Sequence, residues 1–233
     1  MSGSSGGVRV LSPSAVHSSL EGIVAAYRKQ GGGEVTLTFE TAPQLVQRIA
    51  NGQVADVIVA PPKVMDELVE LGHAEADGRL QLGRVGIGVA MRAGAPLPDV
   101  SSTAALKHAL LEADSITHTR ASSGIYVAKL LERLGIAAAI KAKTASFPGA
   151  QETFTRLLNG TGRDIGFGGI TEIKRWHDKG LRLVAPLPAD IQNYTTYCAA
   201  LAKDPPNCDG AQEFLKFLGS PAAKAVLLAN GVE

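Results

Sequence analysis

The sequence has few of the residues that mark disulfide-stabilised and metal-binding proteins. There are 2 cysteines among 233 residues, and aromatic residues make up 5%. Cys198 and Cys208 cannot form the disulfide framework of a small secreted scaffold, and their spacing matches no zinc-binding motif. They could close a short loop over residues 203–207, which would fit an oxidising compartment, or remain free thiols. We therefore expect no metal site, and the state of the two thiols stays open.

An excess of charge and a long apolar run are also lacking. Lys and Arg together number 23 and Asp and Glu 22, which gives a net charge of +1. This balance argues against a groove for nucleic acid or a surface for lipid headgroups. The sequence contains no apolar run of about 18 residues, so we expect no membrane insertion.

No secretory signal is visible at the start of the chain. Residues 1–7 (MSGSSGG) are interpreted as a flexible tag or linker, which could have replaced a signal or could be a native cytosolic start. We expect a periplasmic protein if a signal was trimmed, with a cytoplasmic protein as the alternative.

Familiar catalytic and cofactor-binding motifs are missing. The chain has no nucleophile elbow, no Walker loop, no H-E-x-x-H and no G-x-G-x-x-G after a predicted strand. Asp56 and Asp164 lie beside or within predicted buried strands, where turn or cap partners are commoner than acid–base groups. We therefore expect no cofactor, and enzymatic activity stays open.

What the chain does contain is a regular alternation of strand and helix patterns. Its first third predicts strands at 8–11, 34–39 and 54–60, with amphipathic helices between them. Thr41 is expected to cap the second helix, with Pro43 in its first turn. This β-α-β-α-β-α order is typical of a parallel sheet with helices on both faces.

The remainder predicts a second set of elements. Strands are expected at 83–91, 115–117, 164–169, 181–185 and 194–202, helices from 101, at 151–158, from 171, at 212–218 and at 222–229, and a strand or short connector at 139–144. Trp176 is expected on a surface helix. The runs 84–91 and 194–202 are predicted to cross between two lobes, one of residues 8–83 plus 195–233 and one of residues 84–194.

The polar turn at residues 117–126 (THTRASSGIY) is central to the functional argument. It leads from a short strand into an apolar helix, and Ser122 or Ser123 is expected as the helix cap. A helix start with free N–H groups, its positive dipole end and the neighbouring Arg120 can bind an anion. An ordinary capped helix is the alternative interpretation.

Several short motifs follow one another in a recognisable order. They are residues 51–60 (NGQVADVIVA), 92–96 (RAGAP), 214–223 (FLKFLGSPAA) and 230–231 (NG). In this order, over nearly the whole chain after Gly7, the sequence resembles the type II periplasmic solute-binding proteins, within them the molybdate-binding-protein-like group. The resemblance implies an α/β fold of two lobes, each a mostly parallel sheet flanked by helices, with two crossovers.

The resemblance also implies a site and a partner. In that family an anion lies in the cleft between the lobes, held by hydroxyls and backbone N–H groups at helix starts, and the protein hands it to an ABC permease. We expect a monomer. Transferred by position, the ligand-binding residues would be Ser12, Ser14, Ala15, Thr41, Ala42, Arg120, Ser122, Ser123, Gly168, Gly169 and Tyr197. Molybdate binders usually carry serines where Ala15 and Ala42 stand, so a small polycarboxylate, which a guanidinium can bind bidentately, is favoured over an oxyanion such as molybdate.

An enzyme is the alternative function. The chain also resembles aconitate isomerase, which is built on the same scaffold. Moving a double bond requires a group that removes a proton and returns it at another carbon. His118, His17 or Tyr197 could do this while Arg120 holds a carboxylate, although no second base is evident. A ligand sensor is a third hypothesis, and the lack of a helix-turn-helix segment argues against a stand-alone regulator.

Overall fold

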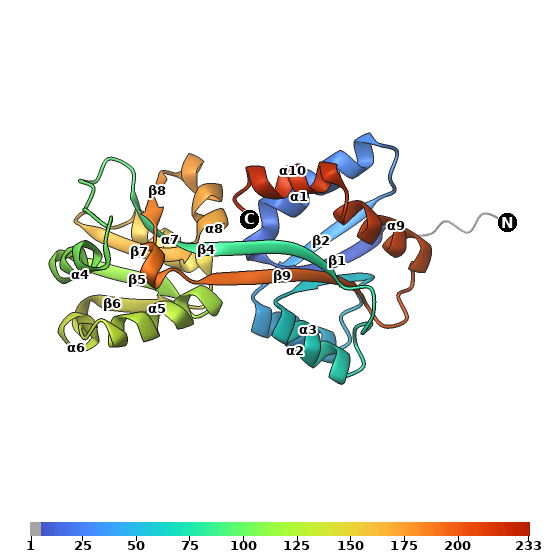
Figure 1. The fold of residues 1–233 in the computed structure, drawn as a ribbon, viewed down its shortest axis with the longest axis horizontal. Helices are drawn as coiled ribbons and strands as arrows, with labels where there is room; N and C mark the ends of the chain where they lie inside the picture. The colour runs from blue at the N-terminus through green and yellow to red at the C-terminus, as the bar shows by residue number, and fades with distance from the viewer. Residues whose placement is uncertain (1–5) are drawn as a thin grey trace. The chain divides into compact units, whose positions relative to one another are not determined.

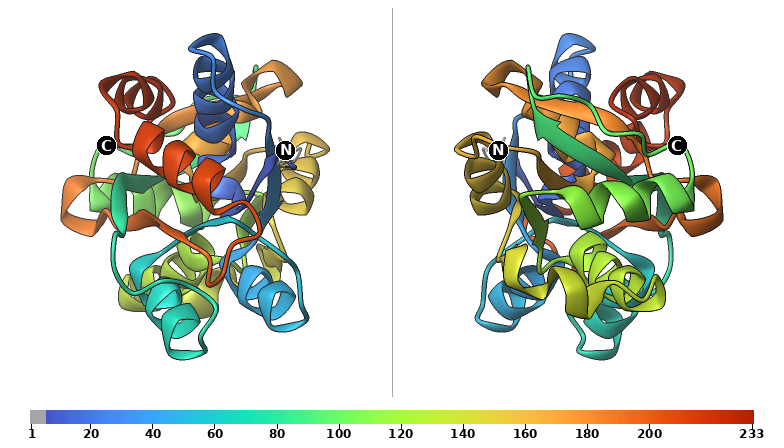
Figure 2. Two further views of the ribbon diagram at one scale, coloured as in Figure 1. Left: turned by 90° about the vertical axis from the view of Figure 1, so that its right-hand side faces the viewer. Right: turned by 90° about the vertical axis from the view of Figure 1, so that its left-hand side faces the viewer.

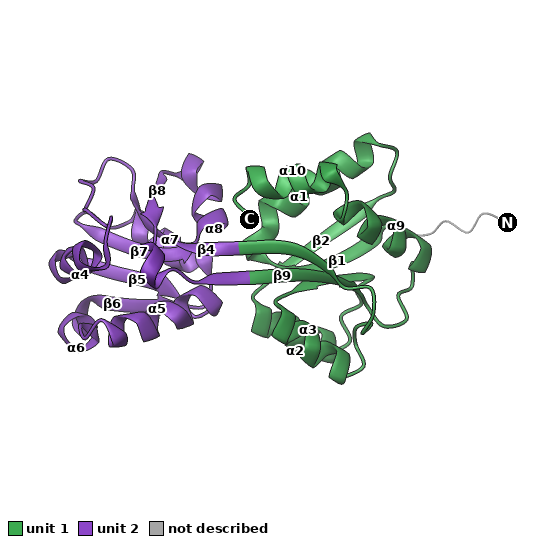
Figure 3. Ribbon diagram, in the orientation of Figure 1, with its two compact units in different colours: residues 1–84, 196–233 green, residues 85–195 purple. Residues whose placement is uncertain are grey.

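The computed structural model describes residues 6–233, so most of the predicted tag at 1–7 lies outside the described residues. The chain divides into two compact units (Figure 3). Unit 1 runs up to Arg84 and resumes at Thr196 to Glu233, and unit 2 is Val85–Thr195. Two long strands, β4 (Leu80–Arg92) and β9 (Tyr194–Leu201), which are labelled in Figure 1, each contain one of the boundaries, where the colour changes in Figure 3.

Unit 1 is a sheet of three parallel strands with one antiparallel neighbour. Besides β9, its elements are β1 (Val8–Pro13), the 3-10 turn η1 (Ser14–Val16), α1 (His17–Lys29), β2 (Val35–Glu40), α2 (Ala42–Ala50), β3 (Val57–Ala60), α3 (Pro62–Glu70), α9 (Cys208–Leu218) and α10 (Pro221–Ala229). The strand order is β2-β1-β3-β9, with β1 parallel to β2 and β3, and β9 antiparallel to β3. α10 packs beside α1 (Figure 1 and Figure 2). In this contact Gly22 of α1 lies against Val226 of α10.

Local signals explain these elements. β3 is buried along its whole length, as expected for a central parallel strand. Thr41 stands at the cap position of α2 as predicted, and its N–H and hydroxyl both donate to Gln44 Oε1, at 3.2 and 2.6 Å. Cys198 is buried in β9 and Cys208 is exposed at the start of α9, and both thiols are free.

Unit 2 is a mixed sheet. Besides β4, it contains α4 (Thr103–Glu112), β5 (Ser115–Thr119), α5 (Ser122–Arg133), α6 (Ala137–Ile140), η2 (Lys141–Lys143), β6 (Thr144–Phe147), α7 (Ala150–Leu158), β7 (Asp164–Gly169), α8 (Ile170–Arg175), η3 (His177–Lys179), β8 (Leu181–Pro186) and η4 (Ala189–Ile191). β5 pairs in parallel with β6 and β7, whereas β4 is antiparallel to β7 and β8.

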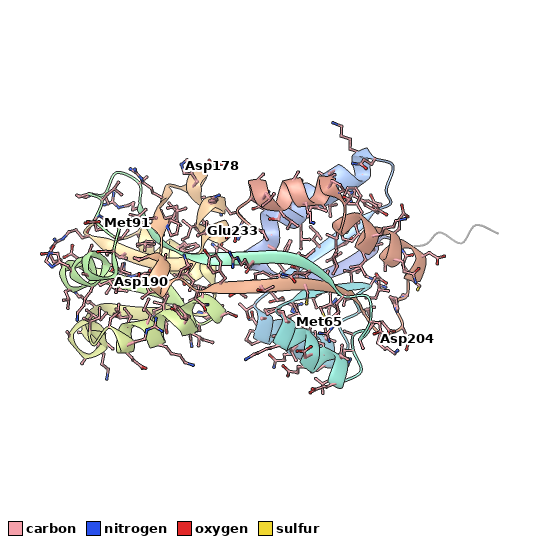
Figure 4. The ribbon with its side chains drawn as sticks, in the orientation of Figure 1. Met65, Met91, Asp178, Asp190, Asp204 and Glu233 are labelled. Carbon is pink, nitrogen blue, oxygen red and sulfur yellow. The ribbon has the colours of Figure 1, made fainter. Side chains whose placement is uncertain are left out.

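Each unit has its own apolar core. In unit 1, Met65 lies in a cluster with residues of α2, α3 and β9, and in unit 2, Met91 lies in a cluster with residues of α4, α5 and β5 (Figure 4). A further cluster of unit 2 packs α7 against α8 and includes Phe154 and Trp176. Among the described residues, no helix has the length and apolar character needed to cross a membrane.

Of the two alternatives for residues 139–144, the structure has the short connector: residues 137–143 form a short helix and a turn, and the strand β6 begins at Thr144. Two other local predictions are wrong. Trp176 is 3% exposed, because its ring packs edge-on against Phe154 with centroids 5.7 Å apart. Ala121 stands at the cap position of α5, and Ser122 and Ser123 are already inside the helix.

Candidate functional site

The carboxyl ends of three parallel strands meet at one edge of unit 2. Thr119 of β5 is in register with Phe147 of β6, and His118 with Phe167 of β7. The helices α5, α7 and α8 each begin within a few residues of these ends. The edge therefore gathers three helix N-termini, whose unsatisfied N–H groups favour an anion.

The start of α5 is shaped by Thr119. The Thr119 hydroxyl accepts from the Ala121 N–H at 3.3 Å, and no side chain caps the helix itself. A β-carbon on Gly124 would lie 1.6 Å from the Thr119 carbonyl oxygen, so only glycine fits this close approach. Ser122 is exposed and Ser123 half-buried in the first turn, which leaves their hydroxyls at the edge.

Arg120 lies in the turn between β5 and α5. Its N–H donates to the Phe147 carbonyl at 2.7 Å, which extends the pairing of β5 with β6. The side chain is exposed, and within residues 6–233 its guanidinium makes no ion pair or hydrogen bond. A guanidinium at an uncapped helix start can bind a carboxylate bidentately.

Acidic side chains distinguish the three helix starts. The first turns of α7 and α8 contain Glu152 and Glu172, whereas the first turn of α5 contains no acidic residue. Glu172 is only 8% exposed, and one carboxylate oxygen lies 3.6 Å from the β-carbon position of Gly169. Since a carboxylate in the first turn offsets the positive end of a helix, α5 keeps the strongest attraction for an external anion.

Unit 1 has a corresponding edge where β1, β2 and β3 end. The helices α1, α2 and α3 begin there, and none has an acidic residue in its first turn. Ser12 is fully buried and its hydroxyl donates to the Pro13 carbonyl at 3.1 Å. Ser14 and Ala15 lie half-buried in η1, and Thr41 and Ala42 lie at the start of α2. This edge therefore gathers the predicted residues of unit 1 other than Tyr197.

An aromatic pair flanks the unit 1 edge. The His17 ring stacks on Phe39 with centroids 3.8 Å apart and planes 14° apart, and His17 Nε2 lies 3.1 Å from a Glu21 carboxylate oxygen. Glu40, at the end of β2, is paired with Arg48 at 2.5 Å. His17 is thus a titratable group beside η1, directly after it in the sequence.

The other predicted residues have different environments. Gly168 is needed for packing, because a β-carbon there would lie 2.7 Å from Phe154 Cζ. Gly169 has room for a β-carbon, with Val85 at 3.4 Å as its nearest neighbour. Tyr197 is 5% exposed in β9. His118 is 8% exposed, its Nδ1 lies 2.9 Å from the Thr119 carbonyl, and its ring lines a pocket of about 210 Å³ with residues of α5 and α6.

Two residues near the edges were missed by the sequence analysis. Glu172 could have been found from its place three residues after the glycine pair that ends β7, where a first-turn acid is common. Phe39 carries no such signal, because its place beside His17 depends on the pairing of β1 with β2. Within residues 6–233, no three His, Cys, Asp or Glu side chains are grouped so that they could hold a metal ion.

The fold and the helix-start edges define a class of protein. Residues 8–233 match the family model described as bacterial extracellular solute-binding protein, and the chain belongs to this family. The type II periplasmic binding protein fold, molybdate-binding-like, is thereby confirmed. The periplasmic molybdate-binding protein of Azotobacter vinelandii is similar in structure, with a TM-score of 0.80, 18% identity, and coverage of 97% of this chain and 98% of that one.

Two further similar proteins are a binding protein and an enzyme by name. The sulfate-binding protein SubI of Mycobacterium tuberculosis has a TM-score of 0.74 at 16% identity, with 97% of this chain and 86% of that chain covered. The aconitate isomerase of a Pseudomonas species is 29% identical over 224 residues, which cover 93% of this chain and 84% of that protein.

Proposed function

We propose that this chain binds a small polycarboxylate through the helix starts at the carboxyl edges of its sheets, and delivers it in the periplasm to an ABC importer. The observation that carries the proposal is the start of α5, which combines uncapped N–H groups, no first-turn acid and the guanidinium of Arg120, for which residues 6–233 provide no ion pair or hydrogen bond. The helix starts of unit 1 also lack first-turn acids, which supports anion binding there.

A polycarboxylate fits these edges better than a tetrahedral oxyanion. At the unit 1 edge Ala15 and Ala42 supply no hydroxyl, and the hydroxyls of Ser12 and Thr41 already donate to the Pro13 carbonyl and to Gln44 Oε1. In unit 2, Ile125 is 53% exposed in the first turn of α5, and Phe147 is half-buried at the end of β6. Apolar side chains at the same edge as Arg120 suit a ligand with a hydrocarbon body and charged ends.

A thermal-shift panel followed by titration calorimetry tests this proposal. The panel contains molybdate, tungstate, sulfate, phosphate, citrate, cis- and trans-aconitate, and simple dicarboxylates. A ligand at 100 times its dissociation constant should add about 2.7 kcal/mol to the free energy of unfolding. Arg120→Met should weaken polycarboxylate binding by about tenfold or more, whereas Arg156→Met, on the exposed face of α7, should not. Stabilisation by molybdate or tungstate alone would contradict the polycarboxylate assignment.

The partner and compartment are tested separately. The gene's own upstream region should encode an export signal, and the exported protein should appear in the periplasmic fraction. Loaded protein should stimulate ATP hydrolysis by its permease in proteoliposomes. If the protein stayed in the cytoplasm and did not stimulate the permease, the transport part of the proposal would be wrong even if the ligand bound.

The second candidate function is isomerisation of a tricarboxylate. It is favoured by the similarity to aconitate isomerase over 93% of the chain. The reaction would break a C–H bond beside the double bond, shift the electron pair across three carbons and return a proton at the far carbon. Of the two first-turn carboxylates at the edge of unit 2, Glu172 is the buried one, and it could carry this proton. His118 is less suited, because its ring lines the pocket beside α5 and α6.

Proton NMR of cis-aconitate mixed with the protein tests this second function. An isomerase should form trans-aconitate in the wild type, and Glu172→Gln should abolish turnover while the tricarboxylate still binds. His118→Ala is the control and should keep turnover. A wild type that binds tricarboxylates without interconverting them is a binding protein only.

A further inference from the structure

A second concave site lies in unit 1, well away from the carboxyl ends of its strands. It is a pocket of about 460 Å³ at the far end of α1, lined by that helix end, the second half of α9 and the turn before α10. α1 has 13 residues, so at a rise of 1.5 Å per residue this end lies about 20 Å from the helix start at His17. The volume is in the range of small-molecule sites.

Aromatic rings form a rigid wall of this pocket. The Tyr27 ring centroid lies 5.2 Å from Phe214 and 5.1 Å from Phe217, with planes 68° and 52° apart. The backbone of Gly32 lies directly on the Tyr27 ring, since a β-carbon there would be 2.5 Å from three ring carbons. Tyr27 is 3% exposed, and burial, followed by the neighbouring Glu213 carboxylate, raises the pKa of its phenol, so the hydroxyl stays neutral. The wall is thus uncharged and fixed in place.

The rim of the pocket is positive on one side. Lys216 is exposed on α9, and within residues 6–233 its ammonium makes no ion pair or hydrogen bond. α10 begins at Pro221 on the same rim with no acidic residue in its first turn, and the Ser220 hydroxyl accepts from the Ala223 N–H at 3.2 Å. The other charged side chain of the lining, Glu213, is next to the Tyr27 hydroxyl. The lining of this pocket therefore combines an ammonium, the positive end of a helix and an aromatic wall.

We propose that this pocket binds a small monocarboxylate with a flat apolar body, such as an arylalkanoic acid. The body lies against Phe217, whose half-buried ring is held in place by Tyr27, and the carboxylate faces Lys216 and the start of α10. The pocket is separate from the helix-start edges, so this ligand and the proposed polycarboxylate can bind independently.

An NMR titration tests the proposal with two matched probes, 3-phenylpropionate and its neutral amide, 3-phenylpropionamide. In ¹⁵N-labelled protein the backbone amides of Gly32, Gly33 and Gly219 lie in or beside the lining, so their signals should shift and saturate. The carboxylate should bind about fivefold more tightly than the amide, as expected for one exposed ion pair. Saturable shifts at Gly124 and Gly169 in their place would put the probe at the edge of unit 2 and overturn the proposal.

Substitutions test the contribution of the Lys216 charge separately from that of the aromatic wall. Lys216→Met should remove the preference for the carboxylate and leave amide binding unchanged. Lys224→Met, at an exposed position of α10 outside the lining, is the matched control and should bind both probes as the wild type does. Phe217→Leu should weaken both probes, with the melting temperature measured to show that the variant is folded. Equal effects of the two lysine substitutions, or equal affinities of the wild type for the two probes, would overturn the proposal.

Discussion

At the scale of single residues, Asp56 joins three segments of unit 1. Its side chain is fully buried and accepts from the Arg9 N–H at 2.8 Å, from the Arg9 guanidinium at 2.8 and 3.0 Å, and from the Asn207 N–H at 2.9 Å. Burial alone would raise the pKa of Asp56, but the hydrogen bonds from Arg9 and Asn207 outweigh it and lower the pKa. β1, β3 and the segment before α9 are thereby held at one carboxylate.

Replacing this carboxylate should destabilise the protein in a pH-dependent way. Asp56→Asn should lower the free energy of unfolding at pH 7 by about 2–3 kcal/mol, measured by urea denaturation. Because the folded pKa lies below the unfolded value of about 4, the wild type keeps the contribution above pH 4 and loses it as the pH falls through the folded pKa. The difference between the two proteins should therefore shrink below pH 4. Glu75→Gln, in the exposed pair with Lys203, is the control and should cost less than about 1 kcal/mol.

Thr117 provides an opposite case. Its hydroxyl is buried in β5 and has no hydrogen-bond partner among residues 6–233, and the side chain is 1% exposed. Thr117→Val should therefore raise the free energy of unfolding by about 1 kcal/mol, since a buried unsatisfied hydroxyl is replaced by a methyl group. Thr119→Val should lower it, because the Thr119 hydroxyl accepts from Ala121. A lower melting temperature for Thr117→Val would show that this hydroxyl has a partner in solution.

At the scale of elements, an acidic residue added to the first turn of α5 should affect ligand affinity and protein stability in opposite ways. α5, α7 and α8 begin at the same edge of unit 2, and α5 alone of these three has no acidic residue in its first turn; Ser122→Glu would add one. The free energy of unfolding should stay equal or rise by about 0.5 kcal/mol. Affinity for the polycarboxylate that stabilises the wild type most should fall about tenfold, measured by calorimetry.

The matched control for this substitution lies in α4. Ala104→Glu adds the same charge to the exposed first turn of a helix that follows no parallel strand of the edge. It should have the same effect on stability and none on affinity. An equal loss of affinity in both variants would show that net charge, and not the start of α5, controls binding.

Most elements could be predicted because their patterns are local. The alternation of β1 to α3 follows from apolar periodicity and from turn residues such as Thr41. The cap of α5 could not, because serine is a strong capping residue by itself, whereas here the Thr119 side chain binds the Ala121 N–H and the helix begins at Ser122.

For the candidate site, the sequence predicts which residues lie at the sheet edge, but it does not predict which way their side chains point. Arg120 and Ser122 follow the end of a strand, which places them at a sheet edge whatever the packing. The direction of the His118 ring depends on which face of β5 is covered by α5 and α6, which is a tertiary fact. The burial of Trp176 depends on Phe154 in the same way.

At the scale of the whole molecule, each unit has its own reporter. Trp176, the sole tryptophan of the chain, is buried in unit 2, and Cys198 is buried in unit 1. Burial raises the pKa of the Cys198 thiol, so a thiol reagent should label Cys208 at once and Cys198 only when unit 1 opens. A polycarboxylate bound at the unit 1 edge should slow Cys198 labelling, and one bound at the unit 2 edge should raise the denaturant midpoint of Trp176 fluorescence. Protection of Trp176 alone would assign the ligand to unit 2.

The division of unit 1 into two segments has a consequence for synthesis on the ribosome. Unit 2 is complete when Thr195 has been made, whereas unit 1 still lacks the last strand of its sheet and the helix that packs on α1. Until residues 196–233 emerge, β3 has an unpaired edge open to association with other chains. The inserted half should therefore fold first during translation, and the half that was begun first should fold last.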